Sequence, residues 1–143
     1  MNKRAGFTLL EILVVVLIIT ILATIVGVKV AQHPGQARVA AARAQMVVFR
    51  NALGLYRMNH GSVPTAAQGL AALCAKPSAP PVPDNYPPEG YLEGGKVPLN
   101  PWGHPYAYLV PGPRGQPFEI VSYGADGEPG GEGENADILL SEL

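Results

Sequence analysis

The feature that most constrains this chain is an apolar run over residues 7–28, which holds one ionisable residue, Glu11. An α-helix of about 20 residues spans a bilayer core of roughly 30 Å, so the run has the length of a membrane-spanning helix. Lys3 and Arg4 precede it, which predicts a cytoplasmic N-terminus and a chain that otherwise faces out of the cytoplasm. We therefore expect a single-pass transmembrane helix over residues 7–30.

Two other interpretations apply to the same run. A secretory signal peptide has an apolar region of about 7–15 residues and a small-residue cleavage site, whereas this run is longer and has no such site before Lys29. A plain membrane anchor fits the length but leaves Glu11 unexplained, because a carboxylate in hydrocarbon costs roughly 2.5–3.5 kcal/mol on insertion scales. Physics alone leaves open whether Glu11 reaches the membrane interface or has a partner.

The residues around Glu11 carry a more specific signal. Residues 3–11, KRAGFTLLE, resemble the class III signal of type IV pilins and pseudopilins. The resemblance implies that a prepilin peptidase removes residues 1–6 as a leader by cleaving between Gly6 and Phe7, and that Phe7 becomes the N-methylated terminus. It also implies an assembly role for Glu11, whose carboxylate neutralises the Phe7 amine of a neighbouring subunit, since two costly charges are better paired.

Charge is distributed unevenly along the rest of the chain. The 143 residues have a net charge of −1, which implies no overall attraction to nucleic acid, and we expect no nucleic-acid partner. No acidic residue lies between Glu11 and Asp84, and no basic residue follows Arg114, so a basic middle precedes an acidic end. Cys74 is the single cysteine, which excludes an internal disulfide, and we interpret it as a small buried apolar residue.

An amphipathic helix is expected over residues 31–60, after the apolar run. The triplet His33-Pro34-Gly35 predicts a kink or short break, because proline removes a backbone hydrogen bond and glycine adds freedom. Apolar residues then recur at helical spacing on one face: Val39, Ala42, Met46, Phe49, Leu53 and Tyr56. Another face carries Gln36, Arg43, Arg50 and Arg57, which either is solvated or meets acidic groups of a neighbouring subunit.

Local signals divide the region that follows. Gly61 is placed to end the helix, and Thr65–Gln68 has the pattern of a capping box that opens a short helix through Leu73. The proline-rich stretch 76–88 predicts an extended loop that covers the domain. We interpret Trp102 as an aromatic residue filling the core, with an indole N–H that needs one partner.

Two strands are predicted over residues 104–109 and 118–123, joined by a turn at residues 111–115 into an antiparallel hairpin. The predicted fold class is therefore α+β. A long N-terminal α-helix, transmembrane in its first half, packs on a small C-terminal domain at residues 61–143 with a short antiparallel sheet.

The acidic loop at residues 122–138 is the stretch with the clearest chemistry. Five glycines and five acidic residues suit a hard cation such as calcium, and the absence of lysine and arginine argues against a phosphate site. Asp126 and Asp137 have the separation of an EF-hand, but Pro129 and the lack of flanking helices argue against that motif. The residues alone leave a calcium site and a solvated acidic turn open.

Three stretches, at residues 100–106, 122–127 and 130–138, are similar to the major pseudopilin of the type II secretion system, and similarity extends over nearly the whole chain. The resemblance implies one structural Ca²⁺ held by Asp126 and Asp137, with carbonyl ligands from around Tyr123 and Asp126. It assigns Glu134 and Asn135 to shaping the loop, and Asn100 stands where relatives usually carry aspartate.

The same resemblance implies a structural subunit, not an enzyme, that polymerises into a periplasmic pseudopilus and drives export of folded proteins across the outer membrane. The implied partners are further copies of the chain, minor pseudopilins, the prepilin peptidase, the inner-membrane secretion platform and, before assembly, membrane lipid. No nucleophile and base can be paired among His33, His60, His104 and Ser122. An adhesive or DNA-uptake type IV pilin and a minor pseudopilin are the alternatives; the missing cysteine pair and acidic end argue against the former.

Overall fold

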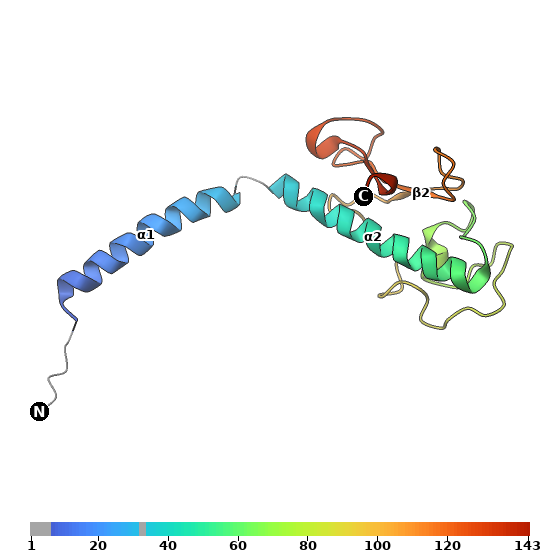
Figure 1. The fold of residues 1–143 in the computed structure, drawn as a ribbon, viewed down its shortest axis with the longest axis horizontal. Coiled ribbons are helices and arrows are strands. Elements are labelled where there is room, and N and C mark those ends of the chain that lie inside the picture. Colours follow the sequence, from blue (N-terminus) through green and yellow to red (C-terminus); the bar gives the residue numbers. More distant parts are fainter. Residues whose placement is uncertain (1–6, 32–33) are drawn as a thin grey trace, which may run out of the picture. The chain divides into compact units, whose positions relative to one another are not determined.

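The computed structural model describes residues 7–31 and 34–143, with side chains over 7–23 and 35–143. The chain forms two compact units, Met1–Pro34 and Gly35–Leu143 (Figure 1). The predicted leader at residues 1–6 and the His33 side of the predicted helix break lie outside the described residues.

The first unit contains the helix α1, Leu9–Ala31. Thr8 caps its first turn: the Glu11 N–H donates to Thr8 Oγ1 at 3.2 Å, and the Thr8 N–H donates to Glu11 Oε2 at 3.5 Å. This reciprocal pair is a capping box, which satisfies backbone donors that a helix start leaves free. All side chains described in this unit are exposed. Among the described residues, no helix meets the length and hydropathy of a membrane span.

The helix α2, Pro34–His60, starts at the boundary between the two units, and its residues from Gly35 onward belong to the second unit. Proline suits the first position of a helix, where its missing N–H has no partner to lose, so the interruption predicted around Pro34 coincides with a helix start. Gly61 ends the helix as predicted, with φ of 79° and its N–H donating to the Arg57 carbonyl at 2.8 Å.

One face of α2 forms the core of the second unit. The six predicted apolar positions are all buried or packed against the core, with Phe49 1% exposed. Phe49 meets the Tyr106 ring edge-on at 5.1 Å between centroids. Ala52 of α2 also belongs to the core, and the other members come from distant segments: Leu70, Ala72, Leu73, Leu92, Tyr106, Ile120, Ile138 and Leu140. The predicted arginine face points toward solvent, with Arg43, Arg50 and Arg57 exposed.

The sheet has three antiparallel strands in the order β1-β2-β3: Ala107–Leu109, Glu119–Ser122 and Ile138–Leu139. The predicted hairpin is confirmed, with Tyr108 opposite Ile120. Its strands are shorter than predicted, in part because Pro105 has no N–H for a ladder. Sequence reasoning missed β3, which is two residues long and directly follows the acidic loop. β2 is central and buried at all four positions.

The capping box at Thr65 and Gln68 forms, and the short helix predicted through Leu73 is present as a 3₁₀ helix at Leu70–Leu73. The Thr65 N–H donates to Gln68 Oε1 at 3.0 Å and the Gln68 N–H to Thr65 Oγ1 at 3.3 Å. Gly69 then has φ of 62° and ψ of −170°, which breaks the helical path, and only a 3₁₀ turn follows at Leu70–Leu73. Gln68 Nε2 also donates to the carbonyls of Ala79 and Pro81, which fixes the predicted proline-rich loop.

Cys74 and Trp102 both pack against the core from its edge. Burial raises the pKa of the Cys74 thiol, which agrees with an unreactive apolar role. Trp102 lies at the boundary of the core and not within it, contrary to the prediction. Its indole N–H has a polar partner, Glu134 Oε2 at 3.3 Å, and that partner belongs to the acidic loop.

Candidate functional site

The acidic loop leaves β2 and returns to the same strand through β3. Its base is closed by the pairing of Ser122 with Ile138. Higher in the loop, the Ala125 N–H donates to the Glu134 carbonyl at 2.9 Å, next to the 3₁₀ turn η2 at Gly133–Asn135. The two arms of the loop are thus held together by a backbone hydrogen bond as well as by the sheet.

Asp126 and Asp137 each accept one backbone hydrogen bond inside the loop. Asp126 Oδ1 accepts from the Glu128 N–H at 3.1 Å, and Asp137 Oδ1 accepts from the Gly130 N–H at 3.0 Å. The Tyr123 carbonyl accepts the Gly127 N–H at 3.0 Å. A carboxylate offers about four lone-pair sites and a carbonyl two, so all three groups keep capacity for a further partner.

Close packing requires glycine at the start of the loop. Gly124 has φ of 58°, and a Cβ there would lie 2.5 Å from the Asn135 carbonyl carbon. A side chain at this position would separate the two arms, and the left-handed backbone adds strain for any other residue. The composition of the loop therefore reflects its geometry as well as its charge.

The oxygen donors of this loop fit a hard cation. Carboxylate and carbonyl oxygens are the ligands that calcium prefers, and the loop contains no lysine or arginine to compete. Within the part of the chain that the structure describes, no three His, Cys, Asp or Glu side chains are grouped as metal ligands. A cation here would accordingly depend on two aspartates together with main-chain carbonyls.

Asn100 is a buried organiser of the loop that sequence reasoning left without a role. Its Oδ1 accepts the N–H groups of Trp102 and His104, at 3.1 and 2.9 Å. Its Nδ2 donates to Ser122 Oγ at 3.0 Å and to the Gly124 carbonyl at 3.4 Å. An ionised aspartate accepts only, so these two donated bonds need the amide. Asn100 thus joins a tight turn to the point where the loop begins.

Glu134 ties the loop to the first turns of α2. Its carboxylate lies 3.9 Å from Arg38 Nη1 and accepts the Trp102 indole N–H. It also covers Gly35, where any side chain would collide with it. A negative charge near a helix N-terminus is favourable, and the first turn of α2 has no acidic residue of its own. These contacts are a physical basis for the loop-shaping role predicted for Glu134.

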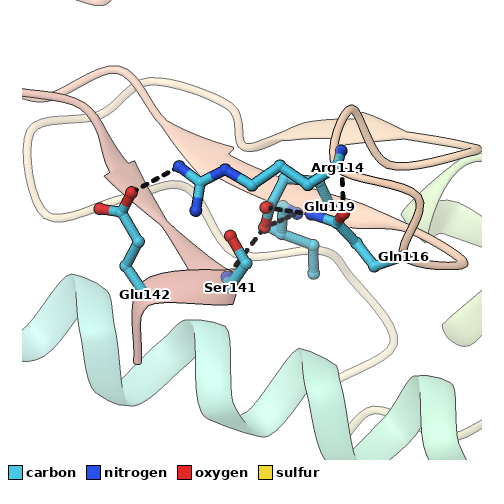
Figure 2. A network of polar contacts seen from close by, with 6 residues as sticks. Arg114, Gln116, Glu119, Ser141 and Glu142 are labelled. Atoms are coloured by element: carbon cyan, nitrogen blue, oxygen red, sulfur yellow. Dashed lines mark hydrogen bonds and ion pairs between the residues drawn. The ribbon is translucent and has the colours of Figure 1, made fainter.

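A second polar network connects β2 and the turn before it to the C-terminal segment that follows β3 (Figure 2). Glu119 on β2 is 1% exposed. Its Oε1 accepts the N–H groups of Ser141 and Ile120, both at 3.1 Å, and its Oε2 accepts Gln116 Nε2 at 2.9 Å. Arg114 Nη2 donates to Glu142 at the rim, at 2.8 Å between two exposed side chains. The sequence showed Glu119 only as a strand residue.

Two opposing effects set the pKa of Glu119. Burial alone raises the pKa of the carboxyl group, but the hydrogen bonds from Ser141, Ile120 and Gln116 outweigh burial and lower the pKa below its ordinary value of 4.5. The carboxylate is consequently ionised. Through its hydrogen bonds it connects β2, the strand that closes the loop, to the segment that follows β3.

The N-terminal site residues occupy the start of α1. Phe7 is 79% exposed, and Gly6, its predicted partner in the cleaved bond, lies outside the described residues. Glu11 serves the capping box with Thr8, a role that the spacing Thr-x-x-Glu could have revealed. The acidic loop belongs to the other compact unit.

These features define a class: a pilin-like structural subunit, with an exposed apolar N-terminal helix followed by a small α+β domain. Comparisons with known protein families identify which subunit family it belongs to. Residues 29–141 match the family described as type II secretion system (T2SS), protein G, and residues 1–27 match the prokaryotic N-terminal methylation motif. The chain belongs to the type II secretion system protein G family.

Relatives in other bacteria match the sequence of this chain along almost its full length. The chain is 45% identical to the type II secretion system core protein G of Pseudomonas aeruginosa, over 96% of this chain and 94% of that protein. It is 43% identical to the protein of the same name from Vibrio cholerae, over 96% and 92%. The crystal structure of the major pseudopilin from the type 2 secretion system of enterohaemorrhagic Escherichia coli has 35% identity and a TM-score of 0.65, covering 76% of this chain and 90% of that one.

The chain is therefore a structural subunit of a type II secretion pseudopilus, and it is not an enzyme. A major pseudopilin polymerises with copies of itself and associates with other components of its secretion system. The resemblance read from the sequence is confirmed at this level, and so is the α+β fold.

Proposed function

We propose that the processed chain polymerises through α1 into a periplasmic pseudopilus that drives export of folded proteins across the outer membrane. The observation that carries this proposal is the match to protein G relatives over 96% of the chain, combined with the N-terminal methylation motif. Before assembly, α1 anchors the subunit in the inner membrane with the N-terminus cytoplasmic and the second unit periplasmic. The apolar run at residues 7–28 and the exposure of the side chains described over residues 7–23 support this anchor.

The proposed processing and assembly residues lie together at the start of the run. Cleavage between Gly6 and Phe7 leaves a cationic, N-methylated Phe7 one residue before the capping Thr8. Glu11 Oε2 bonds the Thr8 N–H at the long distance of 3.5 Å, so the carboxylate retains most of its accepting capacity. Glu11 is available both to cap its own helix and to neutralise the Phe7 amine of a neighbouring subunit.

Replacing Glu11 tests the assembly mechanism. Glu11→Ala is expected to leave the amount of membrane-inserted subunit unchanged, because it removes a costly charge, and to lower pseudopilus assembly and secretion strongly. Fibres sheared from cells carrying the other secretion components measure assembly, and membrane fractions measure insertion. Thr8→Ala is the matched control: it removes the same cap but keeps the carboxylate. Assembly of Glu11→Ala at the level of the unaltered chain would contradict the proposed role.

We also propose that Asp126 and Asp137 bind one structural Ca²⁺, with the Tyr123 carbonyl among the main-chain ligands. When bound, the ion holds the two arms of the loop together in the folded state, and its binding free energy adds to the stability of the domain because the site does not exist in the unfolded chain. The oxygen-only donor set and the absence of lysine and arginine from the loop support this assignment. Glu134, Asn100 and the glycine at position 124 hold the arms in place around it.

Thermal unfolding with millimolar calcium and then with excess chelator tests the metal. At a hundredfold excess over Kd, binding to the folded state alone stabilises by roughly 2.7 kcal/mol, so a clear rise in the midpoint is expected. Asp126→Ala and Asp137→Ala should each abolish the rise. Glu128→Ala, on the same loop, should keep it. A midpoint that does not respond to calcium would reduce the loop to a solvated acidic turn.

A further inference from the structure

The exposed arginine row on α2 has no partner within the described chain. Arg43, Arg50 and Arg57 recur every seven residues and lie on a different face from the buried core positions. Successive members are about 10.5 Å apart along a helix axis, so the row is an extended strip of positive charge. The described side chains form two ion pairs, Arg38 with Glu134 and Arg114 with Glu142, and neither uses this row.

The row cannot be neutralised by its own helix. No acidic residue lies between Glu11 and Asp84, so α2 contains no carboxylate at the spacings that pair charges along a helix. The acidic residues of the loop after Pro83 lie between Lys76 and Lys96 in the sequence, so their charge is partly balanced. Residues 122–138 carry five acidic residues and no lysine or arginine. The strongest negative surface of the chain is therefore the acidic loop.

Two carboxylates of that loop have no interaction partner among the described residues. Glu134 pairs with Arg38, and Asp126 and Asp137 accept bonds from the loop backbone and are assigned to the cation. Glu128 and Glu132 are exposed, and no hydrogen bond or ion pair involves their carboxylates among the described residues. The contact of Glu134 with Arg38 shows, within one subunit, that this loop is compatible with arginines of α2.

We propose that the arginine row of α2 docks on Glu128 and Glu132 of a second copy of this chain in the pseudopilus. A fibre needs a head-to-tail interface in which two different surfaces of one subunit are complementary. A chain of net charge −1 that separates its basic helix face from its acidic loop carries both surfaces. This inference rests on the proposed function, since it requires polymerisation, and it assigns contacts outside α1.

Charge reversal and compensation test this contact in the full chain. Arg43→Glu with Arg50→Glu is expected to cause about a tenfold or larger loss of sheared fibres, because attraction becomes repulsion at every repeat. Glu128→Arg with Glu132→Arg should cause a similar loss, and all four changes together should restore fibres. Lys76→Glu with Lys96→Glu is the matched control: it reverses two exposed cations elsewhere and should assemble normally. Calcium is kept saturating, and unchanged unfolding midpoints confirm folding.

The outcomes separate this inference from the proposed function. Loss followed by restoration supports the contact. Normal assembly of the arginine reversal overturns it while leaving polymerisation intact, whereas absence of fibres from the unaltered chain overturns the proposed function itself. Loss without restoration also overturns the contact with the acidic loop. Binding of the unaltered chain, but not the arginine variant, to vesicles rich in phosphatidylglycerol over neutral vesicles would then identify a lipid headgroup as the partner.

Discussion

The two helices of this chain have similar lengths, 23 residues in α1 and 27 in α2, but they are stabilised in opposite ways. In α2 one face is buried against the sheet and loops of its own unit, with Ala42, Met46 and Leu53 fully buried. In α1 every described side chain is exposed, including Leu9 at 84% and Leu17 at 55%. A helix that is apolar on all sides has no single face to bury.

The difference shows which partner each helix requires. The apolar side chains on one face of α2 are buried within the chain, so substituting them is expected to lower folding stability. In the function proposed above, the apolar surface of α1 contacts lipid or other subunits, so substituting its residues is expected to change insertion and assembly while the folded unit keeps its stability. The following predictions test that division, from the largest effect to the smallest.

Phe49→Ala should produce the largest loss of folding stability. Phe49 is 1% exposed and packs edge-on against Tyr106, and truncating a buried aromatic residue typically costs about 3–5 kcal/mol. Urea unfolding of the full chain in detergent measures the change in free energy. Leu55→Ala, on the same helix at 54% exposure, is the control and should change stability by less than about 0.5 kcal/mol. Equal effects of the two substitutions would mean that α2 is not packed as described.

Leu17→Arg is the corresponding test in α1. Leu17 lies at the middle of the apolar run, where an arginine raises the cost of membrane insertion by roughly 2.5–3.5 kcal/mol. We expect a large shift of the subunit from the membrane fraction and loss of fibres, without a change in the urea midpoint of the second unit. Leu17→Ala should leave both readouts nearly unchanged. A lowered urea midpoint for Leu17→Arg would show that α1 contributes to folding after all.

Glu119→Gln should have the smallest effect and the clearest pH signature. The substitution keeps an oxygen acceptor but replaces hydrogen bonds to a charged group, worth about 1.5–3 kcal/mol, by neutral ones worth about 0.5–1.5 kcal/mol, so a net loss of about 1–2 kcal/mol is expected. Because the folded pKa of Glu119 is lowered, its stabilisation is fully present above the unfolded value of 4.5 and is lost as pH falls through the folded pKa. Unfolding followed from pH 7 downward should therefore be less pH-dependent in the variant.

Arg114→Ala is the control for that measurement, because it alters the exposed half of the same network (Figure 2). An exposed ion pair is screened by solvent and salt, so we expect its loss to leave the unfolding midpoint and its pH dependence unchanged. Sensitivity to Arg114 equal to that of Glu119 would refute the assignment of the stabilising contact to the buried carboxylate.

Local patterns in the sequence determined a large part of this protein. The spacing of apolar residues identified the buried face of α2 from Ala42 to Tyr56, because helical periodicity is a local property. The order of residues in KRAGFTLLE and in the acidic loop indicated the family, which the comparisons confirmed. The hairpin and the helix end at Gly61 followed from turn chemistry in the same way.

Tertiary structure alone decided the features that depend on distant residues. Glu119 reads as an ordinary strand position, and only the return of the chain after β3 brings the Ser141 N–H to its buried carboxylate. Asn100 and Glu134 acquire roles because the fold brings Gly124, Trp102 and Arg38 to them from other segments. The short strand β3 exists because β2 offers a free edge to it. Sequence periodicity reports which face of an element is buried; the identity of its partners is a long-range property that requires the folded chain.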